Sequence, residues 1–111
     1  MQARFSYAIA FVADMEKAIA FHRDVLGLKP RFTSPHWSEF ETGDVTLALH
    51  PASNENPAGT VQLGFSVDDV RKVFEARGEN GLEFTAAPRP ESGTTLARIR
   101  NCEGAEISLA S

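Results

Sequence analysis

Three side chains in the first half of the chain, Trp37, Glu39 and His50, have chemistry suited to a small-molecule site. Gly43-Asp44 is a two-residue turn signal between two β-compatible stretches, so these stretches should pair antiparallel with Trp37 opposite His50. Directly paired residues share one face of a sheet. His50 could act there as a general base oriented by Glu39, and Trp37 could stack on an aromatic or cationic ligand.

The same residues also fit plainer roles. Trp37 is the only tryptophan, and its ring could instead pack against a partner subunit. Glu39 and His50 could belong to a solvated strand face, because charged side chains are mostly exposed. His22 lies in a predicted helix and fits a partly exposed surface position, while His36 follows a proline and fits a loop.

Length and composition predict a single domain. The 111 residues are 42% hydrophobic and 23% charged, and a chain of this size can bury one core. The net charge is −4 and the basic residues are scattered, which disfavours nucleic acid and anionic membrane as partners. The single cysteine fits a reducing compartment, and no signal-like or membrane-spanning stretch is apparent, so we expect a cytoplasmic protein.

The first half of the sequence predicts one strand, one helix and three more strands. Asp14 can cap a helix over residues 15–26, where apolar residues recur at the 3.6-residue period, and Gly27 would end it. A loop rich in Pro, Asn and Gly covers residues 51–59. We expect strands over residues 5–12, 29–33, 36–42 and 45–50.

The second half predicts the same succession of elements. Asp68 or Asp69 would cap a helix over residues 70–77, which Gly78 would end. Pro-rich residues 88–90 predict a turn. We expect strands over residues 60–67, 83–87, 94–100 and 105–110, with a further turn at 101–104.

The two halves are a repeat. Val12-Ala13-Asp14 and Val67-Asp68-Asp69 stand 55 residues apart, and Lys17 and Lys72 have the same offset. One such unit cannot bury the apolar faces of both its helix and its sheet, so two should pack with helices outside and a curved sheet inside. The predicted fold class is therefore α+β, a single domain over 1–111 with one module at about 1–52 and another at about 58–111.

Three sequence motifs carry a family resemblance. Residues 11–27 contain a Val-Ala-Asp strand exit, an aromatic pair and Arg-Asp-Val-Leu-Gly, and this stretch resembles the opening motif of the glyoxalase/bleomycin resistance protein/dioxygenase (vicinal oxygen chelate) superfamily. Residues 65–70 resemble its counterpart in the second half. Asn101-Cys102-Glu103-Gly104 stands where many members have Asp-Pro-Asp-Gly. The resemblance implies two tandem βαβββ modules that form a cup, in which members usually hold a divalent metal that chelates vicinal substrate oxygens.

The metal positions implied by this resemblance fall on Tyr7, Ala48, Gln62 and Ser108. Members usually have His or Gln at the first position, and Glu at the positions of Ala48 and Ser108. An alanine donates no ligand atom and a serine hydroxyl is a poor neutral donor, so at best Gln62 remains. The resemblance therefore implies that the metal site is lost, which disfavours glyoxalase I chemistry.

If Ala48 faces the cup, the strand pairing brings further side chains to the same face. The paired residues are Trp37, Glu39, Glu41, Thr46, Ala48 and His50. Arg98 could enter the cup as an anion clamp or could be a solvated strand-end arginine. The expected ligand-binding residues are Tyr7, Trp37, Glu39, Ala48, His50, Gln62, Arg98 and Ser108.

Two functions remain open at this stage. One is metal-free binding of a small hydrophobic or aromatic molecule by a homodimer, as in bleomycin-resistance-like members; the acidic net charge suits cationic ligands. The other is an enzyme of the glyoxalase-type lyase, isomerase or dioxygenase class. It would use either an unusual metal set of Gln62, Glu39 and His50 or a Glu39/His50 acid–base pair.

Overall fold

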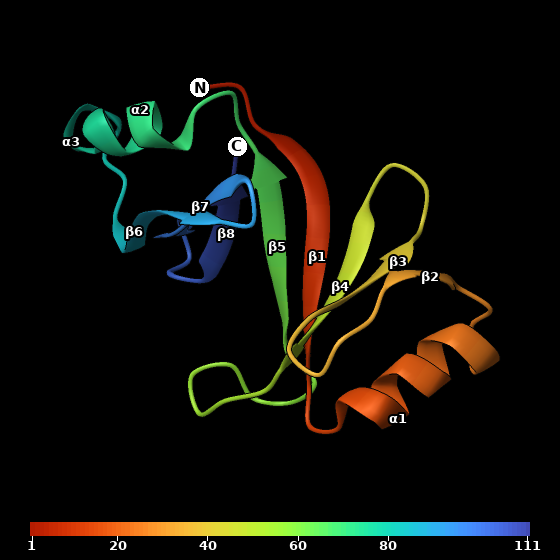
Figure 1. Cartoon of the computed structure of the whole chain (residues 1–111). Helices are drawn as coiled ribbons and strands as arrows, with labels where there is room; N and C mark the ends of the chain where they lie inside the picture. Colours follow the sequence, from red (N-terminus) through yellow and green to blue (C-terminus); the bar gives the residue numbers. More distant parts are fainter. The chain divides into compact units, whose positions relative to one another are not determined.

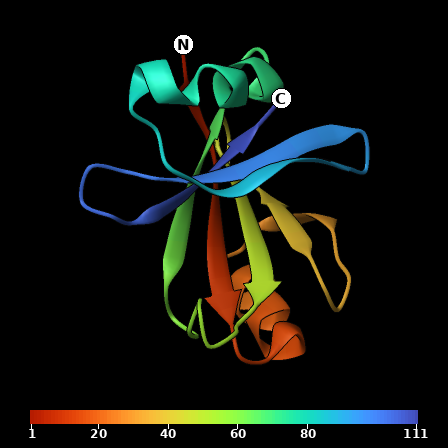
Figure 2. The same cartoon turned by 90° about the vertical axis from the view of Figure 1, so that its left-hand side faces the viewer.

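A computed structural model describes residues 1–111 and contains two compact units. The first unit covers Ser6–Gln62, and the second covers Met1–Phe5 together with Leu63–Ser111. Each unit follows the order strand, helix and three strands, as the repeat predicts (Figures 1 and 2). The predicted α+β class with two βαβββ modules is therefore confirmed.

The sheet of the first unit has the strand order β2-β3-β4-β1. β1 and β4 pair in parallel, and the other neighbours are antiparallel. The helix α1 lies beside the strands of this unit (Figure 1). The elements are β1 (Arg4–Val12), α1 (Met15–Ala20), η1 (Phe21–Val25), β2 (Lys29–Phe32), β3 (Ser38–Glu41) and β4 (Thr46–Pro51).

The first helix begins at its predicted cap and ends near its predicted stop. The Asp14 carboxylate accepts a hydrogen bond from the Lys17 amide at 3.1 Å, as a helix N-cap does. Its last turn is the π-helical segment η1, and Gly27 follows with a φ of +71°. This left-handed conformation favours glycine, so the helix stops there.

The two faces of the first sheet have different environments. On the α1 side, Phe40 and Leu49 are fully buried, and the His22 ring lies 5.6 Å from the Phe40 ring. His22 packs in this layer and is half-buried, in agreement with the partly exposed position that the sequence predicted. The opposite face carries the cluster of Ile9, Phe11 and Ala48, with Tyr7, Trp37 and Ala52 packed against it.

The predicted β3–β4 register is confirmed. Glu39 pairs with Ala48, and Glu41 pairs with Thr46. Trp37 lies just before β3, and its ring centroid is 6.1 Å from that of His50. The strands are shorter than predicted, so residues 42–45 form a longer connection that contains Gly43 at a φ of +89°.

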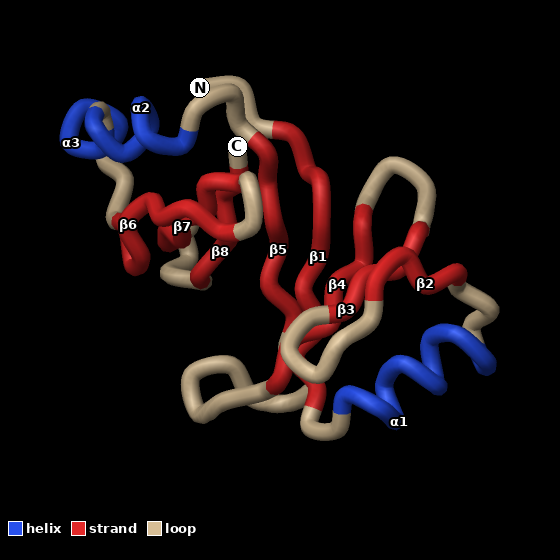
Figure 3. Tube along the Cα trace, in the orientation of Figure 1, coloured by secondary structure: helices blue, strands red, loops and turns tan.

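The sheet of the second unit has the strand order β5-β8-β7-β6. β5 and β8 are parallel, as β1 and β4 are in the first unit, and α2 and α3 lie along one side of it (Figure 3). The core beneath α2 consists of Val67, Val70, Val73, Ala97, Ile99 and Leu109. The elements are β5 (Val61–Ser66), α2 (Val70–Glu75), α3 (Arg77–Asn80), β6 (Phe84–Glu91), β7 (Thr94–Arg100) and β8 (Glu106–Ala110).

The predicted end of the second helix at Gly78 is wrong. The chain bends at Ala76 and continues as α3, which contains Gly78. Gly81 is the residue with a left-handed φ, +67°, and the Leu82 amide donates to the Arg77 carbonyl oxygen at 2.9 Å. The helical segment therefore ends at Gly81, the glycine that takes the left-handed conformation.

The turn predicted at residues 88–90 is also wrong. Pro88 and Pro90 lie within β6, and the turn follows at Ser92-Gly93, both with positive φ. β6 is an edge strand that pairs only with β7, and its register shifts between Ala86 and Arg89. Prolines are tolerated there because an edge strand has amide positions that need no partner.

The helix caps of the two modules are equivalent, so removing one should weaken folding. The Asp69 carboxylate accepts from the amides of Arg71 and Lys72 at 3.0 and 3.2 Å. We expect Asp69→Ala to lower the free energy of unfolding by about 1 kcal/mol in urea denaturation. Asp68→Ala is the matched control, because Asp68 is exposed and does not cap. Equal effects of the two changes would contradict the assigned cap.

Candidate functional site

The candidate site lies on the face of the first unit's sheet that is turned away from α1. Four strands contribute to it, and their pairing is what brings the side chains together. Parallel pairing sets Tyr7 beside Thr46, Ile9 beside Ala48 and Phe11 beside His50. The side chains of this face that form the candidate site are Tyr7, Ile9, Phe11, Arg31, Trp37, Glu39, Thr46, Ala48 and His50.

A chain of hydrogen bonds fixes the polar part of the site. The Trp37 Nε1–H donates to Glu39 Oε2 at 2.7 Å. Arg31 Nη1 donates to Glu39 Oε1 at 3.3 Å and to Thr46 Oγ1 at 3.0 Å. Both carboxylate oxygens of Glu39 are thus engaged, and the carboxylate holds the indole and the guanidinium in fixed positions.

The sequence analysis missed Arg31, which lies on the same face at a β-bulge in β2. Pro30 pairs with Phe40 and Phe32 pairs with Glu39, so Arg31 is an extra residue in β2. Lys29 pairs with Glu41 on the site's side of the sheet, so alternation along β2 gives Arg31 the same face, and the bulge leaves Arg31 without a directly paired residue on β3. The available signal was alternation along the predicted strand 29–33, which places Arg31 on one face with Lys29.

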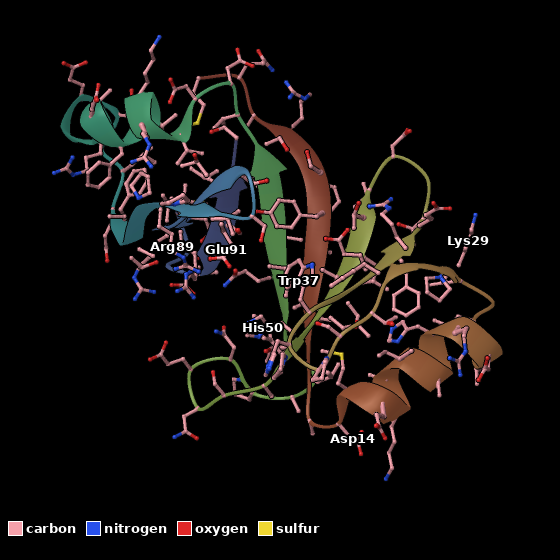
Figure 4. The ribbon with its side chains drawn as sticks, in the orientation of Figure 1. Asp14, Lys29, Trp37, His50, Arg89 and Glu91 are labelled. Atoms are coloured by element: carbon pink, nitrogen blue, oxygen red, sulfur yellow. The ribbon has the colours of Figure 1, made fainter.

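His50 forms part of an aromatic wall. Its ring lies edge-on to Trp37, at 6.1 Å between centroids, and to Phe11 at 5.6 Å. Figure 4 shows the labelled Trp37 and His50 side chains next to each other. His50 Nδ1 is 2.8 Å from the Pro51 carbonyl oxygen, so Nδ1 carries the proton and Nε2 is left as an acceptor.

Glu39 and His50 are not hydrogen-bonded to each other. Instead Trp37 stands between them, with its Nε1 on Glu39 and its ring edge-on to His50. A directly coupled acid–base pair of the predicted kind would need the Glu39 carboxylate on a histidine nitrogen. The arrangement favours Glu39 as a residue that positions Trp37 and Arg31.

The floor of the site is apolar. Ala48 is fully buried, and it packs with Ile9 and Phe11, which are 7% and 6% exposed. Tyr7 and Trp37 are half-buried at the edges of this cluster. An apolar floor with an aromatic wall and a few oriented polar groups is the usual construction of a small-molecule site.

The residues at the four metal positions do not fit a divalent ion. Tyr7, Ala48 and Gln62 belong to the first unit, and Ser108 belongs to the second. Ala48 offers only a methyl group, and Glu39, the carboxylate paired opposite it, has both oxygens engaged. No group of three or more His, Cys, Asp or Glu side chains within residues 1–111 is arranged to hold a metal.

The second unit has a polar cluster at the positions equivalent to Arg31, Glu39 and Thr46, but the arginine, the glutamate and the threonine occupy different positions in it. Arg98 pairs with Ser108, and its Nη1 lies 3.6 Å from Glu106 Oε1. Thr85, the extra residue of a bulge in β6, donates to Glu106 Oε2 at 2.6 Å. The positions of Arg31, Glu39 and Thr46 in the first unit correspond to those of Thr85, Arg98 and Glu106 in the second.

Comparison with known proteins identifies the family. The sequence matches the model of the Glyoxalase/Bleomycin resistance protein/Dioxygenase superfamily over residues 4–109, and the chain therefore belongs to this superfamily. No curated protein matches the sequence.

Solved structures share the fold at low sequence identity. A hypothetical protein from Bacillus halodurans C-125 has a TM-score of 0.81 at 16% identity, covering 99% of this chain and 94% of that one. A variant of Streptomyces coelicolor methylmalonyl-CoA epimerase in complex with 2-nitronate-propionyl-CoA has a TM-score of 0.79 at 16% identity, with coverages of 96% and 92%. A mutant of 4-hydroxymandelate synthase from the same organism has a TM-score of 0.70 at 26% identity, with coverages of 96% and 38%. These likenesses establish the fold.

The position of Glu39 predicts a stability effect. Glu39→Ala leaves the Trp37 indole and the Arg31 guanidinium without their carboxylate partner, so we expect the free energy of unfolding to fall by about 1–2 kcal/mol. Urea denaturation followed by the fluorescence of Trp37 measures the change. Glu41→Ala should cost less than about 0.5 kcal/mol, because Glu41 is exposed and lies 3.9 Å from Lys29. A larger loss in Glu41→Ala would contradict the assigned role.

Proposed function

We propose that this protein binds a small hydrophobic or aromatic molecule at the candidate site and does so without a divalent metal. The main support is the aromatic wall of Trp37 and His50 above the apolar floor at Ala48. Trp37 is held by the Glu39 carboxylate, so little side-chain freedom remains to be lost on binding. A methylmalonyl-CoA epimerase with the same fold holds a small molecule, 2-nitronate-propionyl-CoA.

The proposal that no metal is resident rests on the types of residue at the site. In the alternative metal set of Gln62, Glu39 and His50, the ion would lie beside the Arg31 guanidinium, whose Nη1 is 3.3 Å from Glu39 Oε1. Two like charges at this distance repel each other, so Arg31 disfavours a divalent cation on Glu39. We therefore propose that any chemistry at this site proceeds without a metal.

A metal-free enzyme is the second candidate function. One observation favours it: the exposed His50 has its Nδ1 on the Pro51 carbonyl and its Nε2 available as a general base. In such an enzyme Glu39 would act only by positioning Trp37, because its carboxylate does not contact His50. Binding alone is the stronger proposal, because no second acid or base is positioned next to His50.

We also propose that the protein is a cytoplasmic homodimer. No helix is long and apolar enough to cross a membrane. An open groove of about 420 Å³ lies in the first unit and is lined mainly by apolar groups, among them Ala10, Val12 and the exposed Phe21 and Val61. Exposed apolar surface of this kind favours burial against another subunit.

The ligand proposal is tested with 2-naphthamide, a neutral aromatic probe. The chain has one tryptophan, so the Trp37 Nε1–H gives a single indole signal in a ¹H–¹⁵N spectrum, and we expect the probe to shift it. His50→Ala should weaken binding about two- to tenfold through the loss of an aromatic contact. His36→Ala, in an exposed loop, is the matched control and should bind normally.

Two results would contradict this proposal. One is an indole signal that stays unchanged at millimolar probe. The other is elemental analysis of untagged protein, incubated with nickel, zinc or iron and then desalted, that finds one tightly held ion per chain.

The dimer proposal is tested by light scattering. We expect a mass of twice 12.1 kDa for the wild type and a shift toward monomer in Val61→Glu, which places a charge in the groove. Val25→Glu is the control, since Val25 is exposed but does not line the groove. A monomeric wild type at micromolar concentration would refute the proposal.

A further inference from the structure

Arg31 brings a fixed positive charge into the candidate site with part of its donor set unused. Its Nη1 binds Glu39 and Thr46, whereas Nε and Nη2 have no partner within the chain. The side chain is 43% exposed, so the unused edge can be reached from solvent. The Nε–Nη2 edge of a guanidinium has the spacing that binds the two oxygens of a carboxylate.

The carboxylate of the site is not available in the same way. Both oxygens of Glu39 already accept hydrogen bonds, from Trp37 and from Arg31. A cationic ligand on Glu39 would lie next to the positively charged Arg31, which repels it, while an anionic ligand would meet donors of Arg31 that have no partner. The second carboxylate on this face belongs to Glu41. Its Oε2 lies 3.9 Å from Lys29 Nζ, and the positive charge of Lys29 partly neutralises it. The polar groups therefore favour an anion, even though the net charge of the chain is −4.

The comparison of the two modules locates this feature in the first unit. Both modules have one extra residue at the same point of the strand that follows the helix. In the first unit that residue is Arg31, whose long side chain crosses to Thr46 on β4. In the second unit it is Thr85, and the arginine, Arg98, comes from the regular strand β7 and pairs with Glu106.

We propose that Arg31 binds an anionic oxygen group of the ligand, so that the ligand class is a small aromatic or hydrophobic carboxylate. The carboxylate takes the Nε–Nη2 edge of Arg31, and the apolar part lies against Trp37 and His50. Glu39 and Thr46 hold the guanidinium in place and leave that edge free. This inference rests on the proposed function, because it names the ligand of the same site.

Three probes of nearly equal shape test the inference: 2-naphthoate, 2-naphthamide and 2-naphthylmethylammonium. Dissociation constants are read from the Trp37 indole signal. We expect 2-naphthoate to bind at least about tenfold more tightly than the amide, the size of one charge-assisted hydrogen-bonded pair, and the ammonium probe to bind most weakly. The advantage of the carboxylate should shrink as salt is raised, because Arg31 is partly exposed.

Variants of Arg31 give the decisive comparison. In Arg31→Gln the carboxylate and the amide should bind equally. Arg31→Lys keeps the charge but loses the paired donors of the guanidinium edge, so a smaller preference for the carboxylate over the amide should remain. Arg89→Gln is the matched control: Arg89 is an exposed arginine on β6, 3.6 Å from Glu91, and its loss should leave the preference intact (Figure 4). Circular dichroism confirms that each variant is folded.

The possible results separate this inference from the proposed function. If the amide binds as tightly as the carboxylate, or if Arg31→Gln keeps the preference, the role of Arg31 is refuted while small-molecule binding stands. If none of the three probes shifts the Trp37 signal, the proposed function fails and this inference fails with it. If Arg31→Gln does not fold, Arg31→Lys decides the test. An unreduced preference for the carboxylate over the amide in that variant would refute binding by the Nε–Nη2 edge.

Discussion

The antiparallel register of β3 and β4 is the constraint on which the candidate site depends. Pairing Glu39 with Ala48 places a carboxylate beside a methyl group on the face turned away from α1. The alternate residues, Phe40 and Leu49, are then buried on the helix side. A slip of one residue would exchange the two sets, burying Glu39 in the hydrophobic core and exposing Phe40. The burial of Phe40 and Leu49 therefore also fixes where the polar chain of Trp37, Glu39 and Arg31 lies.

The two modules show how one backbone plan supports different chemistry. The two modules agree in their strand order, in the parallel pairing of their first and last strands, in the aspartate that caps the helix and in the position of the bulge. The three side chains at the bulge and its neighbours differ in order, with arginine at the bulge in one module and in the regular strand in the other. The backbone thus specifies three positions on one face, and the side chains decide whether a donor edge remains unused.

Much of the fold was predictable because it depends on local signals. Asp14 and Asp69 cap helices through contacts within three residues, and the β3–β4 register follows from a short connection. The prediction failed where distant pairing overrides local preference. Pro88 and Pro90 form a turn by their own preference, yet they join a strand because β6 lies at an edge.

The candidate site was predictable to a similar degree. Alternation along β4 placed Ala48 and His50 on one face with Trp37 and Glu39, as the structure has them. Arg31 was not found, because the sequence gives no turn signal that fixes the register of β2 against β3. The hydrogen-bond partners of Glu39 were missed because a strand pattern gives the face of a residue but not the direction of its hydrogen bonds.

The prolines of β6 also bear on how the protein behaves at high concentration. An outer strand offers a row of main-chain amides that can recruit a strand from another molecule and start fibrous aggregation. Pro88 and Pro90 supply no such hydrogen, and the shifted register beside them bends the strand. The outer edge of the second unit's sheet is thereby a poor template for sheet extension and is protected from edge-to-edge growth.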